Sequence, residues 1–81
     1  MTWKQWKKVS HRLKKVFTFD NYEETMAFVN DVADLAEEAN HHPTMTVGYD
    51  EVVIELTTHD AGNTITEKDR LLAERIDDIH G

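Results

Sequence analysis

The only proline of the chain, Pro43, limits the possible folds most, because it stands directly after two adjacent histidines in the stretch NHHPT. A residue that precedes proline is disfavoured in the helical region, so a helix arriving from the N-terminal side must end before Pro43. The residues before it carry an apolar stripe at helical spacing, made of Phe28, Val29, Val32, Leu35, Ala36 and Ala39. A helix is therefore predicted here, with His41 and His42 leaving its end.

The start of this helix is marked by the stretch DNYEE. Asp20 or Asn21 is the expected N-cap, with a glutamate three positions later, an arrangement that satisfies free amide groups at a helix start. Before it, residues 6–19 are predicted to form two short strands that reverse at residues 10–11. Because that turn lacks glycine and asparagine, a helical turn within the first 14 residues is the alternative.

After the proline, apolar and polar residues alternate in two runs. Residues 44–47 and 52–57 are expected to be antiparallel strands joined by a tight turn near Asp50. Residues 62–63 (Gly-Asn) break the second strand, and TEKD at residues 66–69 predicts a capping box that opens another helix. The side chains expected to face inward from that helix are Leu72, Ala73, Ile76 and Ile79.

The resulting order is β-β-α-β-β-α within 81 residues, a length suited to one domain and too short for two. Two hairpins, each followed by a helix, predict a four-stranded antiparallel sheet with both helices on one face, an α+β two-layer sandwich. Residues 1–81 are thus expected to form a single domain. The other face of the sheet would be only partly apolar, which suits burial by another subunit.

Composition excludes several kinds of site and partner. The chain has no cysteine, so disulfides, thiol nucleophiles and cysteine-ligated metal centres are excluded. No apolar run approaches the roughly 18 residues that span a bilayer and no signal-peptide pattern is seen, so a cytoplasmic protein without a membrane partner is expected. The first 15 residues hold all but three of the nine basic residues and none of the 16 acidic ones. The net charge of -7 would nevertheless repel nucleic acid, so a solvated basic strand face is the favoured interpretation.

Three of the five histidines lie where predicted elements end. His41 and His42 leave the first long helix, and His59 ends the last strand. Histidine can both donate and accept a proton near neutral pH, so such a cluster suits acid-base catalysis. Asp69 lies ten residues after His59 across a turn, where its carboxylate is expected either to complete the helix cap or to orient an imidazole.

A metal site is the competing interpretation of these histidines. Strong zinc signatures place ligands a few residues apart on one element, whereas 17 positions separate His42 from His59. Adjacent residues of an extended segment point to opposite sides, so His41 and His42 are not expected to share one ion. Acid-base chemistry without a metal is therefore the favoured hypothesis.

Several short patterns follow one another along the chain. E-x-x-x-H-H-P runs from Glu37 to Pro43, with Tyr49 six residues on. V-x-I-x-L-x-T-H then runs from Val52 to His59, and T-x-x-D-x-x-L-A from Thr66 to Ala73. In this order and spacing, with F-x-F at residues 17–19 and the amphipathic helix, the sequence resembles the pterin-4a-carbinolamine dehydratase family over nearly all of its length.

The resemblance implies a lyase that removes water from 4a-hydroxytetrahydropterin to give quinonoid dihydropterin. The reaction would proceed by histidine acid-base catalysis, without a metal or redox cofactor, and would support tetrahydropterin recycling. The implied catalytic set is His41, His42, His59 and Asp69. The implied pocket for the pterin ring is formed by Glu37, Asn40, His41, His42, Thr57, Thr58, His59 and Asp60. Which histidine is the acid and which the base stays open.

The resemblance also bears on partners and on a rival function. Family members form dimers and tetramers, so a homodimer or homotetramer is expected. The rival is a non-catalytic binding or assembly module that keeps the fold, but such a scaffold gives no chemical reason to retain three histidines. Two departures from the family pattern stand out: Met45 replaces a bulky aromatic residue, which implies a softer pocket wall, and the turn GNTI is one residue longer.

Overall fold

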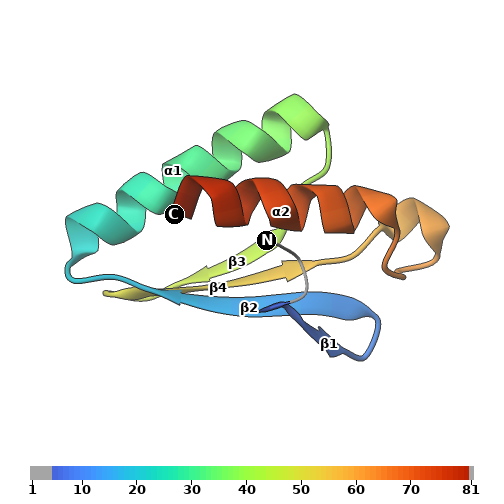
Figure 1. The fold of residues 1–81 in the computed structure, drawn as a ribbon, viewed down its shortest axis with the longest axis horizontal. Coiled ribbons are helices and arrows are strands. Elements are labelled where there is room, and N and C mark those ends of the chain that lie inside the picture. Colours follow the sequence, from blue (N-terminus) through green and yellow to red (C-terminus); the bar gives the residue numbers. More distant parts are fainter. Residues whose placement is uncertain (1–4, 81) are drawn as a thin grey trace.

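The computed structural model describes residues 5–80 and confirms the predicted order of elements (Figure 1). The strands and helices are β1 (Lys7–Val9), β2 (Arg12–Thr18), α1 (Tyr22–Ala39), β3 (Thr44–Val47), β4 (Glu51–Leu56) and α2 (Glu67–His80). The strands pair antiparallel in the order β1-β2-β4-β3, and both helices cover one face of the sheet (Figure 1), so the predicted two-layer sandwich is confirmed. A short 3₁₀ helix, η2 (His59–Ala61), follows β4 and is not indicated by the sequence pattern.

The start of α1 is capped by Asn21 rather than Asp20. The Asn21 side-chain oxygen accepts the Glu24 N–H at 2.8 Å, while the Glu24 carboxylate lies 3.4 Å from the Asp20 N–H. One residue further on, the buried Thr25 hydroxyl donates to the Asn21 carbonyl at 2.9 Å. The Asn21 and Glu24 side chains thus accept from amide groups at the start of the helix that would otherwise be left free, while Thr25 ties the first turn to the cap residue.

The end of α1 is formed by Asn40, which adopts a left-handed conformation with φ 52°. Its N–H reaches the Ala36 and Glu37 carbonyls, and the His41 N–H also bonds to Ala36 O at 3.1 Å. Asparagine is one of the few residues besides glycine that adopts this conformation readily. The helix thus ends before Pro43 as predicted, and the left-handed residue turns the chain that carries the histidines.

The core lies between the sheet and the two helices. Its buried apolar side chains are Trp6, Leu13, Phe17, Phe28, Val32, Val52, Ile54, Leu56, Leu72, Ala73 and Ile76. Met45 is partly buried against this cluster. Ala39, which was expected to face inward, is exposed, because it lies in the last turn of α1 beside an open hollow that Leu71 and Leu72 also line.

The prediction that Ile79 faces inward is wrong, since its side chain is 40% exposed. At about 100° per residue, the buried stripe of α2 is centred between the directions of Leu72 and Ala73, and Ile79 falls at its edge. His80 takes the inward direction instead, with its ring centroid 5.0 Å from that of Phe17 in an edge-on contact. An aromatic contact with a polar residue therefore replaces the expected aliphatic one.

The N-terminal hairpin is tied to α2 through Asp77. Trp6 Nε1 donates to Asp77 Oδ2 at 3.1 Å, and Lys15 Nζ donates to Asp77 Oδ1 at 2.8 Å. Trp6 is almost fully buried, so its ring contributes apolar area while its one polar atom is satisfied. This contact closes the core at the start of the described chain.

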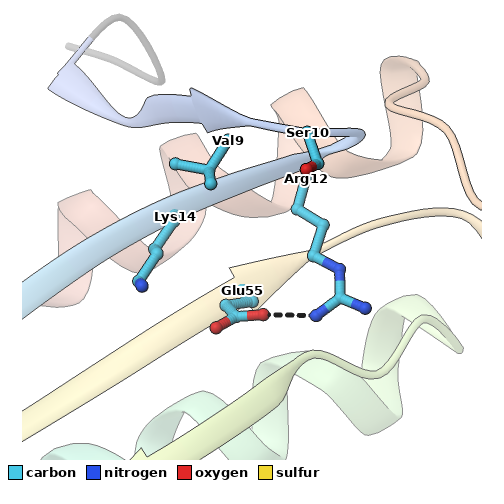
Figure 2. Close-up of a pocket in the computed structure, with 5 residues that line it drawn as sticks. All are labelled: Val9, Ser10, Arg12, Lys14 and Glu55. Atoms are coloured by element: carbon cyan, nitrogen blue, oxygen red, sulfur yellow. Dashed lines mark hydrogen bonds and ion pairs between the residues drawn. The ribbon is translucent and has the colours of Figure 1, made fainter.

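The outer face of the sheet carries a mixed surface (Figure 2). Arg12 Nη1 lies 2.6 Å from Glu55 Oε1, and this pair borders a hollow of about 280 Å³ that Val9, Ser10 and Lys14 also line. Val9 is 46% exposed, in keeping with the partly apolar face expected from the sequence. Within residues 5–80, neither helix is long and apolar enough to cross a membrane.

Candidate active site

The end of α1, the end of β4 and the start of α2 lie at the same end of the molecule (Figure 1). A further hollow, of about 260 Å³, is lined by residues that follow α1, that follow β4 and that begin α2. Its lining residues are Asn40, His41, His42, Thr58, His59, Asp60 and Lys68. The fold thus brings together the three histidines singled out in the sequence and three further residues of the implied pterin pocket. Of that implied set, Glu37 and Thr57 do not line the hollow, and neither does Met45, which is part of the wall expected from the resemblance.

His41 is held by Asp69, which is fully buried. His41 Nε2 lies 2.6 Å from Asp69 Oδ1, and the His41 side chain itself is only 12% exposed. A carboxylate can only accept hydrogen bonds, so the His41 Nε2 carries a proton and donates it to Asp69. In the neutral ring, Nδ1 is then the nitrogen left without a proton.

The other carboxylate oxygen of Asp69 is also occupied. Oδ2 accepts the Thr58 hydroxyl at 2.7 Å and the Thr66 N–H at 2.9 Å. The Thr58 hydroxyl has one hydrogen, which it donates to Asp69. The Thr66 hydroxyl must therefore be the donor in its 2.7 Å contact with the Thr58 hydroxyl. Three donors therefore fix the carboxylate that orients His41, and no buried side-chain polar atom of the described residues lacks a partner.

The two roles expected for Asp69 turn out to be combined. Through Oδ2 it accepts the N–H of Thr66, the residue before α2, which is half of a capping box. Through Oδ1 it orients an imidazole, but that imidazole belongs to His41 and not to the nearer His59. Along the chain His59 is the nearer histidine, but the left-handed Asn40 turns the chain so that His41, 28 positions away, reaches Asp69.

His42 and Glu37 form an exposed pair. His42 Nε2 lies 2.7 Å from Glu37 Oε2, with the two side chains 57% and 78% exposed. His41 and His42 thus turn to different helices, as adjacent residues of an extended segment should. Solvent screens such an exposed contact, so it orients His42 with little effect on stability.

His59 is oriented by its own loop. His59 Nδ1 lies 2.6 Å from the side-chain oxygen Oδ1 of Asn63, on the surface of the molecule. Thr57, which precedes this loop, donates its hydroxyl to the His11 carbonyl at 3.0 Å and so faces the first hairpin instead of the hollow. Each of the three histidines therefore has one ring nitrogen occupied by a different acceptor.

Among residues 5–80, no three histidine, aspartate or glutamate side chains are placed so that they can hold a metal ion. The separate partners of the histidines account for this arrangement. His41 turns to α2, His42 to α1 and His59 to its own loop.

Lys68 is a lining residue that the sequence analysis missed. It was interpreted only as part of the capping stretch TEKD. A signal was present, because a basic residue in the first turn of a helix is unfavourable next to the positive end of the helix dipole. A positive charge at this position slightly destabilises the helix, which indicates that Lys68 has a role other than helix formation.

Comparison with known proteins decides the family. The family model described as "Pterin 4 alpha carbinolamine dehydratase" matches residues 1–79. The chain belongs to this family. A protein of Thermomicrobium roseum, provisionally named a pterin-4-alpha-carbinolamine dehydratase, is 47% identical over 74 residues, which is 91% of this chain and 78% of the relative. One of Haloarcula marismortui with the same provisional name is 47% identical over 76 residues, 94% of this chain and 82% of the relative.

Solved structures of pterin dehydratase relatives share the fold. A transcriptional coactivator/pterin dehydratase from Brucella melitensis superposes with a TM-score of 0.88 at 31% identity, covering 94% of this chain and 82% of that one. A pterin dehydratase-like protein described as a RuBisCO assembly factor in the alpha-carboxysome superposes with a TM-score of 0.80 at 32% identity, covering 94% and 89%. The family fold is therefore found with more than one described role.

Proposed function

We propose that this protein dehydrates 4a-hydroxytetrahydropterin to quinonoid dihydropterin, as a step of tetrahydropterin recycling. The observation that carries the proposal is the convergence of His41, His42 and His59 on one hollow, each with one nitrogen already bonded and the other left over. A hollow of about 260 Å³ falls just below the usual range of ligand-pocket volumes, which suits a bicyclic ring better than a nucleotide.

The reaction requires one proton to be delivered and one to be removed. The bond from C4a to the hydroxyl oxygen breaks, the oxygen takes a proton from a histidine, and water leaves. A second histidine removes a proton from a ring nitrogen as the carbon–nitrogen double bond forms, so atoms and charge balance. The proton donor gains a proton back from solvent as the acceptor loses one, which restores the site.

His41 is the histidine best supported to act as the acid. When its ring carries two protons, the buried Asp69 balances the positive charge on the Nε2 side, and the second N–H is free for the leaving hydroxyl. His42 and His59 are left to serve as base or as hydrogen-bonding groups. Asn40, Thr58 and Asp60 supply donors and acceptors for the pyrimidine edge of the pterin. Lys68 supplies a further donor.

The test is the rate at which chemically generated 4a-hydroxytetrahydropterin loses water, followed by ultraviolet absorbance. Wild-type protein should accelerate the spontaneous reaction, and His41→Ala should reduce that acceleration by about 100- to 10,000-fold, as loss of an acid-base group does. His11→Ala is the matched control, because this exposed histidine lies in the turn after β1 and should leave the rate unchanged. A folded wild type that only matches buffer would refute the enzyme proposal.

A second candidate function is assembly without turnover. It is favoured by the likeness to the protein described as a RuBisCO assembly factor, at 32% identity over 94% of this chain. The same rate measurement separates the two candidates, since an assembly module requires folded protein but no acceleration. A homodimer or homotetramer and a cytoplasmic location stay predictions, and light scattering of the purified protein would test the first of them.

A further inference from the structure

We infer that Asn63 is a positioning residue for His59: its side-chain oxygen holds the proton on Nδ1 and so presents Nε2 as the proton-accepting nitrogen. The inference rests on the proposed function for its catalytic meaning, and it makes His59 the base of the dehydration. The contact itself, 2.6 Å from His59 Nδ1 to Asn63 Oδ1, can be tested without any assay of turnover.

The loop that carries both residues is closed by its own backbone. Thr58 N–H donates to the Thr64 carbonyl at 2.9 Å, and the Thr58 carbonyl accepts the Asn63 N–H at 3.0 Å. Within the loop, the Gly62 N–H bonds to the His59 carbonyl at 3.0 Å. Thr58 is also bonded to the buried Asp69, so the loop is attached to the core at its base. Asn63 is therefore held at a set distance from the His59 ring.

The backbone at Asn63 admits only a few residue types. Gly62 and Asn63 both adopt left-handed conformations, with φ of 80° and 58°. Glycine would fit the second position as well as asparagine, because it has no Cβ to strain. A purely conformational role thus requires no amide group at residue 63, whereas the contact with His59 does.

The chemistry of the amide decides the tautomer of the ring. An amide oxygen can only accept, so the Nδ1 facing Asn63 Oδ1 carries the proton, and the Nε2 of a neutral His59 has the free lone pair. His41 and His42 are bound in the opposite sense, with Nε2 against a carboxylate. His59 alone among these three is held through Nδ1 by an uncharged oxygen.

This arrangement lets His59 take a proton without losing its support. When Nε2 accepts a proton from the substrate ring nitrogen, Nδ1–H keeps its bond to Asn63, so the ring need not move. The electron pair of the broken N–H bond completes the carbon–nitrogen double bond as the hydroxyl leaves with the proton from the acid. The proton on Nε2 then passes to solvent, to which the exposed ring is open.

The first measurement is the ¹⁵N NMR signature of the His59 ring at a pH where it is neutral. We expect the proton on Nδ1 in wild type and a shift toward the Nε2–H form in Asn63→Gly, which keeps the backbone and removes the amide. Asn63→Asp restores an acceptor in a residue that tolerates the left-handed region, and it should restore the Nδ1–H form. Ser10→Gly is the matched control, because Ser10 is also left-handed (φ 56°) and lines the separate hollow beside Arg12 and Glu55.

The second measurement is the kinetics of dehydration by the same proteins. Asn63→Gly should lower kcat about tenfold or more with little change in KM, as the loss of a partner that orients a reacting histidine does, and Asn63→Asp should recover much of it. Ser10→Gly should match wild type in both constants. An unchanged kcat in Asn63→Gly, despite a changed tautomer, would overturn the assignment of His59 as the base.

The two measurements keep this inference separate from the proposed function. A wild-type His59 that carries its proton on Nε2, or a tautomer that Asn63→Gly leaves unaltered, would overturn the positioning role whatever the activity. If wild type failed to accelerate dehydration, the proposed function and the base assignment would both fall. The NMR result would still decide whether Asn63 orients the ring.

Discussion

His41 and His59 reach the same hollow on two very different supports. His41 bonds to a fully buried carboxylate 28 positions away. The Thr58 hydroxyl, just after β4, and the Thr66 N–H, just before α2, hold that carboxylate in place. His59 bonds to a side chain four positions away, on an exposed loop. The partner of His41 is part of the buried core, whereas the partner of His59 belongs to the same surface loop as His59 itself. Disturbing the first should therefore cost stability and activity together, whereas disturbing the second should cost activity alone.

Asp69→Ala should have the largest effect. Three donors would lose their acceptor and a cavity would open, so the free energy of unfolding should fall by about 3–5 kcal/mol. Urea denaturation measures this loss. Asp78→Ala, at an exposed position of the same helix, should leave the transition within about 0.5 kcal/mol of wild type. Equal midpoints for the two variants would show that the buried network contributes no stability.

Thr58→Val should have an intermediate effect on the same network. The substitution keeps the shape of the side chain but removes the hydroxyl that links Asp69 to Thr66, at a cost of about 1–3 kcal/mol. Thr57→Val is the matched control one residue earlier, because its hydroxyl bonds to the exposed turn at His11. The comparison fails if the two threonine variants unfold at the same urea concentration.

Glu37→Ala should have a small effect on stability. The partner His42 is exposed and both side chains are open to solvent, so the change in unfolding free energy should stay within about 1 kcal/mol. The dehydration rate should fall only a few-fold, because His42 keeps its place in the chain and loses only its orienting contact. Glu38→Ala, which removes an exposed pair with Arg75, controls for the loss of one acid from α1. A loss of stability as large as that of Asp69→Ala would erase the contrast.

Asn63→Gly should also have only a small effect on stability. Glycine adopts the left-handed backbone at least as easily as asparagine, so unfolding should shift by no more than about 1 kcal/mol. Its effect on kcat would then exceed its effect on stability, whereas Thr58→Val should lower stability measurably. Thermal unfolding beside the kinetic assay gives both quantities, and a variant that melts far below wild type would show that the loop is structural.

The features that could be predicted from the sequence are the local ones. The cap at Asn21, the helix end before Pro43 and the alternation of β4 each depend on neighbours a few residues apart, so the pattern carries them. The pairing of Asp69 with His41 could not be predicted, because nearness in sequence favoured His59. That pairing depends on how the left-handed Asn40 aims the chain after α1, which no spacing rule contains.

The same limit explains two further differences. Lys68 was taken for a capping neighbour because the stretch TEKD satisfied a local rule, and its position at the hollow depends on where β4 ends. Ile79 follows the helical spacing, but the width of the buried stripe of α2 is set by its packing against Phe17 and the sheet. Periodicity locates a stripe, and only the packed partner decides which residues at its edge are covered.

The two hydrogen-bonding roles of the Asp69 carboxylate have an evolutionary consequence. Because one oxygen caps α2 and the other supports His41, selection for a folded chain alone is enough to preserve this residue, together with Thr58. A lineage that kept the fold for assembly and abandoned chemistry would be free to change Asn63, Glu37 and His59 first, since their contacts lie at the surface. If the proposed dehydratase activity holds, substitutions at the exposed half of the site, and not at its buried half, would therefore be the first sign that a descendant had lost it.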